Sequence, residues 1–380
     1  MTQAVQGYAE GYYGRLPSWQ ERRVLLDTLA RHGQNTYYYA PKEDARHRLN
    51  WREPYDSEWR REFALFCDAA RELGIRVVAG VAPGLDFDFK DLQGGPDRRL
   101  LFDKCRQLLA DGADGLSLLM DDIDEDFPSR SGGMTSEGLA HARLANALAD
   151  ELGRSLWVTP RIYANELAAS APDYLPDFLA TLYESQTVLY CGRDIVTRRA
   201  DCLDIRQVAP TSAHSLVLWD NLYANDYCPQ RLFVGAWSGR DHVTDCVLNP
   251  TGLLHTDCLL LDMMATTHSR GPGGDAEGVW SEVMVRHGVP EEFRAVAGYF
   301  AHPVFNGEEF HPPLPPDAAT LAAIETCLWR WKTPLSREWY PFLFGLKLDL
   351  LIQQGKMSPL RIRKTQSAPL AVRLGVGGTS

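Results

Sequence analysis

The chain has 380 residues, of which 45% are hydrophobic and 23% are charged, as in soluble globular proteins with one large domain or two. Its net charge of −11 argues against non-specific nucleic-acid binding, which relies on a clustered basic surface. No apolar run approaches the roughly 20 residues needed to span a bilayer, and no secretion signal opens the chain, so we expect no membrane partner.

Strand-like and helix-like segments alternate along the first part of the chain. Eight strands alternating with helices over roughly 270 residues are typical of a (β/α)8 TIM barrel, which usually takes about 250. A doubly wound open sheet is the alternative, but no GxGxxG motif follows the first strand. The predicted strands are 6–10, 35–39, 76–82, 115–120, 156–159, 187–190, 215–219 and 246–248, and the predicted helices between and after them are 19–31, 57–73, 97–110, 136–152 and 253–267.

A Gly/Pro-rich stretch at 271–274 predicts the end of the barrel. We therefore place a catalytic barrel in 1–272, a small helical appendage in 273–366 and a disordered tail in 367–380. Helical appendages often mediate dimers, so a homodimer is kept as an alternative to a monomer. Within the appendage, helical patterns occur at 280–286, 290–300, 318–331 and 339–353.

Two adjacent carboxylates, Asp121 and Asp122, follow the fourth predicted strand. In TIM barrels the active site lies at the C-terminal ends of the strands. Two like charges so close cannot easily both stay ionised, so the pKa of one carboxyl should rise. A carboxyl with a raised pKa can donate a proton at neutral pH, as cleavage of a glycosidic bond requires. Taken alone, the pair could equally be a helix N-cap and a solvated acid in a charged loop.

Polar, amide and aromatic residues follow several other predicted strands. Aromatic rings with amides and carboxylates on an apolar wall suit a sugar. Several of these residues also have plainer explanations. Lys42 could form a surface ion pair, and Gly11 could merely permit positive φ. Trp219 could pack in the core, and Asp226 could belong to a turn. These candidate binding residues are Gly11, Lys42, Tyr163, Trp219, Asn221, Asp226 and Asn249.

A metal site is the main competing chemistry. Asp121, Asp122, Asp124 and Asp126 could hold Mg²⁺ or Ca²⁺. The run lacks the glycine and the terminal glutamate of a calcium loop, and the histidines form no HxH or HExxH pattern. Neither a Walker loop nor a GxSxG motif is present. We therefore expect no metal and no organic cofactor.

The eight cysteines are scattered and form no CxxC pair. Most lie in apolar helix or strand contexts, where a buried free thiol is the expected state. A reducing compartment fits this pattern, so we expect a cytoplasmic protein.

Several segments together resemble glycoside hydrolases of family 84, the group of O-GlcNAcases and bacterial β-N-acetylglucosaminidases. They extend over nearly the whole predicted barrel. The segments are 10–15 (EGYYGR), 35–44 (NTYYYAPKED), 47–48 (HR), 51–53 (WRE), Tyr55, 83–86 (PGLD), 121–124 (DDID), 218–221 (LWDN), 224–227 (ANDY), 231–233 (RLF), 239–240 (GR) and 248–250 (LNP).

The resemblance implies a retaining mechanism in which the substrate's own 2-acetamido oxygen attacks the anomeric carbon and forms an oxazoline. It implies that Asp121 orients the acetamido N–H and that Asp122 protonates the leaving oxygen and then deprotonates water. The remaining roles come from the same resemblance. Gly11 and Lys42 would meet the sugar hydroxyls, Asn221 and Tyr163 would hold the acetamido group, Trp219 would wall its pocket, and Asp226 would bind the distal hydroxyls with Asn249 close by.

The fifth strand departs from the family pattern. The family usually has Cys-Pro-Thr-Glu-Tyr there, whereas this chain has Thr159, Pro160, Arg161, Ile162 and Tyr163. Thr159 thus replaces a pocket cysteine, and Arg161 and Ile162 are expected to change the rim. We expect removal of terminal β-linked N-acetylglucosamine from a glycan, a glycoprotein or another glycoconjugate. The alternatives are a hexosaminidase for oligosaccharides or glycosylated small molecules, and a sugar-binding barrel without turnover.

Overall fold

The computed structural model describes residues 4–123, 127–201, 204–210, 213–305, 308 and 317–358. The chain forms two compact units. The barrel unit is Met1–Asn221 with Gly239–Pro250, and the helical unit is Leu222–Ser238 with Thr251–Ser380. The predicted boundary at residue 272 lies inside the helical unit, and the predicted tail at 367–380 lies outside the described residues.

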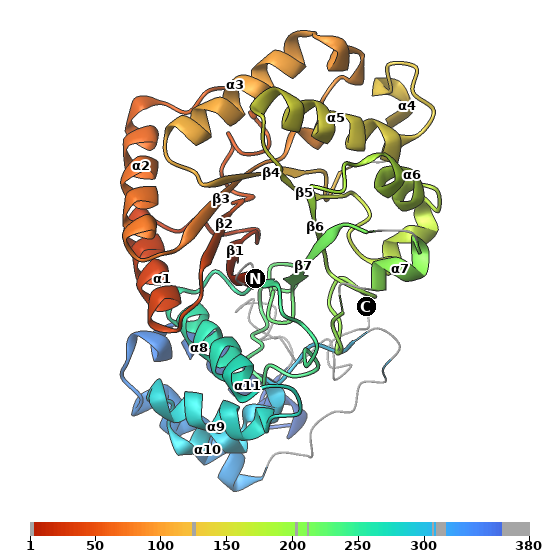
Figure 1. Cartoon of the computed structure of the whole chain (residues 1–380). Coiled ribbons are helices and arrows are strands. Elements are labelled where there is room, and N and C mark those ends of the chain that lie inside the picture. Colours follow the sequence, from red (N-terminus) through yellow and green to blue (C-terminus); the bar gives the residue numbers. More distant parts are fainter. Residues whose placement is uncertain are drawn as a thin grey trace. The chain divides into compact units, whose positions relative to one another are not determined.

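Eight parallel strands close into a barrel in the order of the chain, which confirms the predicted TIM fold. The ring closes where β8 pairs with β1, with Cys246 opposite Gln6. Figure 1 shows several helices outside this ring, namely α1 (Trp19–Arg31), α2 (Ser57–Glu72), α3 (Pro96–Ala110), α5 (Glu137–Leu152) and α6 (Tyr174–Thr181). The strands are β1 (Gln6–Glu10), β2 (Thr36–Tyr39), β3 (Arg76–Val81), β4 (Gly115–Leu119), β5 (Trp157–Thr159), β6 (Thr187–Tyr190), β7 (Ser215–Asp220) and β8 (Cys246–Leu248).

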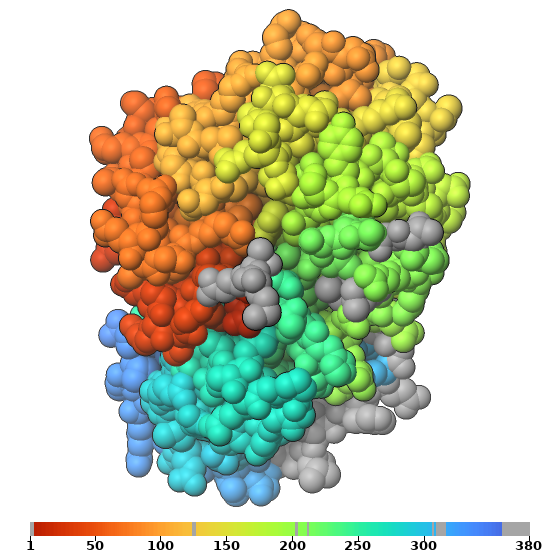
Figure 2. Space-filling model, viewed as in Figure 1, coloured from red at the N-terminus to blue at the C-terminus, as the bar shows by residue number. Residues whose placement is uncertain are grey.

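Side chains from several strands fill the interior of the barrel. Residues of β1, β2, β3, β4, β5, β6, β7 and β8 contribute to one buried cluster, and Figure 2 shows the outer surface of the chain in the same view as Figure 1. Tyr38 of β2 is central, because it stacks on Trp157 at 5.7 Å and meets Trp219 edge-on at 5.3 Å. Its hydroxyl donates to Ser117 Oγ at 2.6 Å, so the polar end of the ring is satisfied within the core.

Side chains cap the first turn of several helices in the barrel unit. Ser18 and Glu21 form a capping box at the start of α1, and Ser136 caps α5. The short helix α6 was not predicted. The helices are α1 (Trp19–Arg31), α2 (Ser57–Glu72), α3 (Pro96–Ala110), α4 (Phe127–Arg130), α5 (Glu137–Leu152), α6 (Tyr174–Thr181) and α7 (Ile205–Val208), with 3₁₀ turns at Pro83–Leu85, Phe89–Gln93 and Asn165–Ser170.

No helix joins β7 to β8. Residues 221–245, all of which are described, form turns and extended loop instead. Part of this connection, Leu222–Ser238, belongs to the helical unit. The conformation of 221–245 therefore departs from the regular strand–helix alternation of the rest of the barrel.

The helical unit contains α8 (Leu254–Arg270), α9 (Ala276–Arg286), α10 (Ala318–Trp329) and α11 (Pro334–Gln353). The helix predicted at 290–300 is wrong, because that segment forms two 3₁₀ turns, Glu291–Ala295 and Ala297–Tyr299. Helix α11 starts earlier than predicted and continues through Pro341. Within the described part of the chain, no helix combines the length and the apolar character needed to cross a membrane.

The cysteines that the structure describes are all free thiols. Five of them are buried, at positions 67, 105, 191, 246 and 327. Burial raises the pKa of Cys105 to about 12, so its thiol stays protonated and unreactive at neutral pH.

Candidate active site

Asp121 and Asp122 lie directly beyond the C-terminal end of β4. The hydrogen bonding between β4 and β5 continues through Met120, whose N–H donates to the Thr159 carbonyl at 2.9 Å. Asp122 then turns out of the strand with a φ of 52°, and it is the one residue other than glycine with positive φ among those described. Such left-handed backbone is strained and often marks functional positions. The turn gives the two adjacent carboxylates different surroundings.

Lys42, from the loop after β2, lies between the two carboxylates. Its ammonium group donates to Asp121 Oδ2 and lies 3.8 Å from Asp122 Oδ2. The lysine is 6% exposed, so the alternative of a surface ion pair is wrong. The second carboxylate oxygen, Asp121 Oδ1, is buried and has no hydrogen-bond partner among the described residues. It is therefore an acceptor without a donor.

Two tyrosine hydroxyls hold the Asp122 carboxylate. Tyr163 donates to Oδ1 at 2.8 Å and Tyr13 donates to Oδ2 at 2.9 Å. In the free protein the Tyr163 hydroxyl contacts the second acid, and its expected help in placing the acetamido oxygen stays a prediction. Tyr13 lies in the 10–15 segment, but the sequence predicts no role for it, because a sequence does not show where the two tyrosines of that segment point.

The pKa of Asp122 is lowered, whereas the sequence predicted that the paired acids would raise the pKa of one member. Burial acts to raise this pKa, but the Lys42 ammonium, hydrogen bonds from Tyr163 and Tyr13 and the Arg48 guanidinium outweigh it. The prediction counted only the like charge of the neighbour and omitted the cations and donors. Asp122 is therefore ionised at neutral pH in the free protein.

Arg48 supports the backbone at the paired acids. Its guanidinium donates to the carbonyl of Asp122 and reaches the carbonyl of Asp121 at 3.5 Å. It is 8% exposed and lies 6.0 Å from the centre of the Tyr13 ring. Arg48 thus holds the strained peptide in place, a role that sequence reasoning missed although the 47–48 motif contained the residue.

A second group of predicted residues forms a buried hydrogen-bonded chain. Asn221 Oδ1 accepts from Trp219 Nε1 and from Asn249 Nδ2, both at 2.9 Å. Asn249 Oδ1 in turn accepts from the N–H of Gly11 at 3.2 Å. These contacts join the ends of β1, β7 and β8 and fix the plane of the Trp219 indole.

Gly11 is required by close packing rather than by backbone conformation. A β-carbon at this position would lie 2.2 Å from Trp219 Cζ2 and 3.3 Å from Asn249 Oδ1. Gly11 is not among the residues with positive φ, in contrast to Gly14. The alternative that Gly11 merely permits positive φ is therefore wrong.

Cys191, at the end of β6, connects the two groups of residues. The Asn221 amide donates to its sulfur at 3.4 Å and to the Ile195 carbonyl at 3.1 Å. Burial, followed by the charges of Asp220, Asp121, Asp122 and Glu166, raises the pKa of this thiol well above its usual value. Cys191 is thus a neutral, packed side chain at the same end of the barrel as both groups.

The residues in and after β5 that differ from the family pattern are buried. Arg161 is 8% exposed and pairs with Glu137 of α5 at 2.7 Å, and Ile162 is 1% exposed. The expectation that these two residues change the rim is therefore wrong, since both side chains are packed away from solvent. Thr159 is also buried.

Eight of the nine predicted site residues thus belong to the barrel unit, and Asp226 belongs to the helical unit. Asp226 is half-buried, and its Oδ1 accepts from the N–H of Tyr227 at 2.9 Å. The described residues contain no group of three or more histidines, cysteines or carboxylates placed to hold a metal ion. Asp124 and Asp126, named in the metal alternative, lie outside the described residues.

Comparison with known proteins identifies the family. A family model for β-N-acetylglucosaminidases matches residues 6–295. The chain is 29% identical over 280 residues to the protein O-GlcNAcases of Rattus norvegicus and of Mus musculus, covering 70% of this chain but only 30% of either relative. A mutant of the Thermobaculum terrenum O-GlcNAc hydrolase shares the fold, with a TM-score of 0.75 and 19% identity over 98% of this chain and 88% of that one. The chain belongs to the β-N-acetylglucosaminidase family.

Proposed function

We propose that the protein is a retaining glycoside hydrolase that removes terminal β-linked N-acetylglucosamine with help from the substrate's own acetamido group. The observation that carries the proposal is the state of Asp121. One of its oxygens pairs with Lys42, and the other is buried and lacks a donor among the described residues. An acetamido N–H is a donor of suitable size and polarity for that oxygen, and the family match supports the same substrate class.

In the first step the acetamido oxygen bonds to the anomeric carbon as the bond to the leaving oxygen breaks. Asp121 accepts a hydrogen bond from the acetamido N–H, where positive charge develops. Asp122 gives its proton to the leaving oxygen. In the second step water attacks the anomeric carbon, its proton passes to Asp122, and the bond to the acetamido oxygen breaks. The configuration is retained because two inversions occur.

Asp122 must gain a proton before the first step, since its pKa is lowered in the free protein. Bound sugar would displace water and leave the carboxyl facing the glycosidic oxygen, an acceptor that favours the protonated form. The hydroxyls of Tyr13 and Tyr163 favour the carboxylate that remains after proton transfer. We infer that Asp122 takes up its proton when substrate binds.

The other residues take the roles that the family resemblance implies. Gly11 and Lys42 would meet the sugar hydroxyls, and Asn221 with Tyr163 would hold the acetamido group. Trp219 would form one wall of the acetamido pocket. Its ring is fixed by an edge-on contact with Tyr38 and by a hydrogen bond to Asn221. For Asp226 and Asn249, binding of the distal hydroxyls stays a prediction.

A series of aryl glycosides with progressively fluorinated N-acyl groups tests acetamido participation. Fluorine withdraws electrons from the acyl oxygen and weakens it as a nucleophile. We expect kcat to fall steeply along the series. A flat series would contradict the proposal, and absence of hydrolysis together with binding of a thiazoline inhibitor would identify a sugar-binding barrel instead.

Paired substrates test the two acids. In Asp122→Asn we expect a loss of about 10²- to 10⁴-fold for poor leaving groups and a much smaller loss for activated phenolates, which leave without a proton. In Asp121→Asn we expect losses on both kinds, because attack by the acetamido oxygen accompanies the departure of every leaving group. If Asp122→Asn lost equal activity on substrates with poor and with activated leaving groups, Asp122 would not be the general acid.

Protein-linked sugar is the proposed substrate class, because the rat and mouse relatives are named as protein O-GlcNAcases. The cysteines described as free thiols support a reducing compartment, consistent with a cytoplasmic location. The competing substrates are oligosaccharides and glycosylated small molecules. Hydrolysis of an O-GlcNAc peptide should exceed that of chitobiose in kcat/KM, and the reverse order would favour the oligosaccharide alternative.

A further inference from the structure

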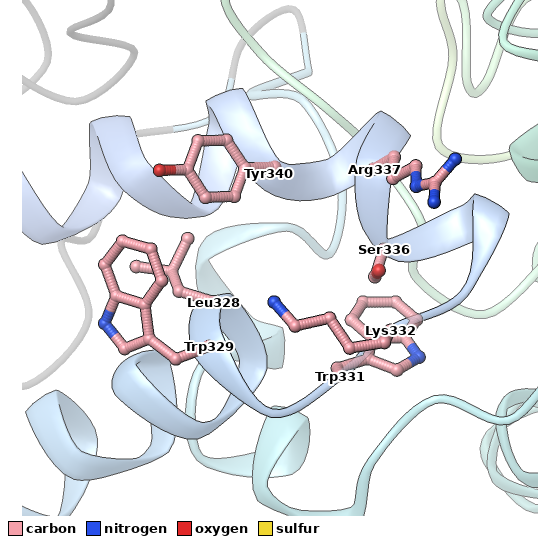
Figure 3. Close-up of a pocket in the computed structure, with 7 residues that line it drawn as sticks. All are labelled: Leu328, Trp329, Trp331, Lys332, Ser336, Arg337 and Tyr340. Carbon is pink, nitrogen blue, oxygen red and sulfur yellow. The ribbon is translucent and has the colours of Figure 1, made fainter.

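A pocket of about 340 Å³ lies in the helical unit, at the junction of α10 and α11 (Figure 3). None of its lining residues belongs to the candidate active site. The size is in the range of small-molecule sites. The pocket is therefore a cavity separate from the candidate active site.

Two cations line this pocket and form no ion pair with any of the described residues. Lys332 and Arg337 are exposed, and neither side chain has an ion-pair or hydrogen-bond partner among the residues that the structure describes. With Arg330 they make three positive charges in residues 330–337, a stretch without any acid, in a chain of net charge −11. The local charge is thus opposite to that of the whole chain and favours an anion.

The start of α11 adds to this positive potential. Helix α11 is 20 residues long, with Thr333 as its N-cap and Ser336 in its first turn. A helix of this length carries partial positive charge at its N-terminus. Ser336 and Arg337 both line the pocket, so the helix start and the free guanidinium act on the same space.

Exposed aromatic rings form the other wall. Trp329 is 46% exposed and Tyr340 is 40% exposed, with their ring centres 6.0 Å apart. Both rings are held from behind, because the Trp329 indole donates to Glu325 and Tyr340 stacks on Phe344 at 5.9 Å. Fixed, solvent-facing rings are suited to stacking against a flat ligand group.

The third aromatic residue carries a donor without an acceptor. Trp331 is 7% exposed, and its Nε1–H is buried with no hydrogen-bond partner in the described part of the chain. Buried indole N–H groups normally find an acceptor. In Figure 3 the Lys332 side chain extends from beside Trp331 towards Trp329, so the ammonium and the aromatic rings lie around one space.

We propose that this pocket binds a small organic anion, with a phosphate or carboxylate group against Lys332 and Arg337 and a flat ring against Trp329 and Tyr340. The cations and the helix start recognise the charge. The aromatic rings recognise either an aromatic ring or the apolar face of a sugar ring. This binding is independent of the proposed hydrolase activity.

Isothermal titration of the whole protein tests the proposal with four probes. Adenosine monophosphate carries an aromatic ring and glucose 6-phosphate a sugar ring, while adenosine and inorganic phosphate each supply only one half of the ligand. We expect one of the two organic phosphates to bind at least about tenfold more tightly than inorganic phosphate and adenosine. Which of the two binds identifies the ring class.

Charge-removing variants locate the site. Lys332→Gln with Arg337→Gln should weaken binding by about tenfold or more, since each cation supplies a charge-assisted contact. Arg330→Gln is the matched control, because it removes the same charge from a nearby exposed residue outside the pocket lining, and it should change affinity less than about twofold. Circular dichroism checks folding, and Lys332→Gln alone serves if the double variant is unstable.

Three results would overturn the proposal. They are no binding of either organic phosphate, equal binding of inorganic phosphate, and unchanged affinity in the Lys332 and Arg337 variants. Hydrolysis of aryl glycosides measures the active site separately, so failure of the pocket and failure of the proposed activity are distinguishable.

Discussion

Asp122 shows how neighbours set the state of one carboxyl. A like charge beside it would raise its pKa, but two phenolic donors and two cations lower it. Both tyrosines remain protonated donors, because burial raises the pKa of Tyr13 and of Tyr163 above the usual range. The acid–base behaviour of the site should therefore depend on these hydroxyls.

Tyr13→Phe should move the pH profile of kcat/KM. The variant removes a donor to the charged form of Asp122, so the pKa of Asp122 rises and the residue stays protonated to higher pH. The limb of the profile on which activity falls with rising pH should shift to higher pH. Tyr183→Phe, at an exposed tyrosine whose hydroxyl contacts Asp150, is the control. An unmoved limb would show that Tyr13 does not influence the acid.

Arg48→Met should lower kcat more than it raises KM. The guanidinium holds the carbonyls on both sides of the strained Asp122 backbone, and its loss lets both carboxylates drift. Misplacement by about 1 Å can reduce rates about 10²-fold. Arg48→Lys should not restore the rate, since a single ammonium cannot span two carbonyls in the same way. Steady-state kinetics that match the unmodified protein would disprove this positioning role.

Gly11→Ala should impair the site through Trp219. The new methyl group would lie 2.2 Å from the indole, so the ring must move and strain its bond to Asn221. We expect a loss of about 1–3 kcal/mol in unfolding free energy, typical of overpacking, and a lower kcat/KM. Gly298→Ala is the control, because a β-carbon there meets nothing within 4 Å. Similar values for both variants would contradict the packing argument.

The sequence was sufficient to predict which residues gather at the strand ends, but not what each side chain contacts. The two acids, Lys42 and Tyr163 could be located because they follow buried strands. Tyr13 and Arg48 were missed because their roles depend on side-chain direction across the barrel rather than on position along it.

At the level of elements, a buried ion pair joins β1 to α1. Arg22 donates to both oxygens of Glu10, at 2.8 and 2.6 Å, and Tyr37 donates to the same carboxylate at 2.6 Å. Glu10 is fully buried, so its charge depends on these partners. The pair orients the first helix against the first strand.

Arg22→Met should destabilise the protein by about 3–5 kcal/mol, because it leaves a buried carboxylate without its cation. Adding Glu10→Gln should recover part of that loss. The exposed neighbour Arg23→Met is the control and should change stability by less than about 0.5 kcal/mol. Urea unfolding followed by tryptophan fluorescence gives the values. Equal stability of the two single variants would show that the buried pair contributes nothing.

Most strand bounds were predicted to within a residue, because parallel barrel strands are buried on both faces and read as continuous apolar or aromatic runs. Helices with capping residues were predicted similarly well. The segment 290–300 failed because its apolar spacing resembles a helix, whereas it folds as two separate 3₁₀ turns. Helix α6 was missed because it has only 8 residues and carries Pro176 near its start.

For the whole molecule, two buried histidines make the free energy of unfolding depend on pH in acid. The pKa of His47 is lowered to about 3, chiefly by burial and then by Lys42, and the pKa of His141 is lowered to about 3 by burial and then by Arg161. Both are neutral when folded but take up protons when unfolded. Their contribution to stability is complete above pH 6.5 and is lost as pH falls towards 3.

His141→Gln should therefore flatten the acid side of the stability curve. Each buried histidine contributes a slope of up to about 1.4 kcal/mol per pH unit, so removing one should reduce the slope by that amount at most. Urea unfolding between pH 4 and 6 measures it, with the exposed His242→Gln as the control. Parallel curves for the variant and the unmodified protein would contradict the assignment.

The barrel could be predicted from the strand count, but the division of the chain between two units could not. Residues 222–238 contain no Gly/Pro-rich stretch like the one at 271–274 that would mark a boundary. Their membership of the helical unit results from contacts that form only in the folded chain.

The interleaved course of the chain has a consequence for synthesis. The polypeptide passes from one unit to the other after residues 221, 238 and 250. A ribosome thus completes β8 only after it has synthesised residues 222–238 of the helical unit, and the helices of that unit, α8 to α11, are not yet translated at that point. Neither unit can be cloned as one uninterrupted stretch, and a product stopped at residue 272 would carry 222–238 and 251–272 without α9, α10 and α11.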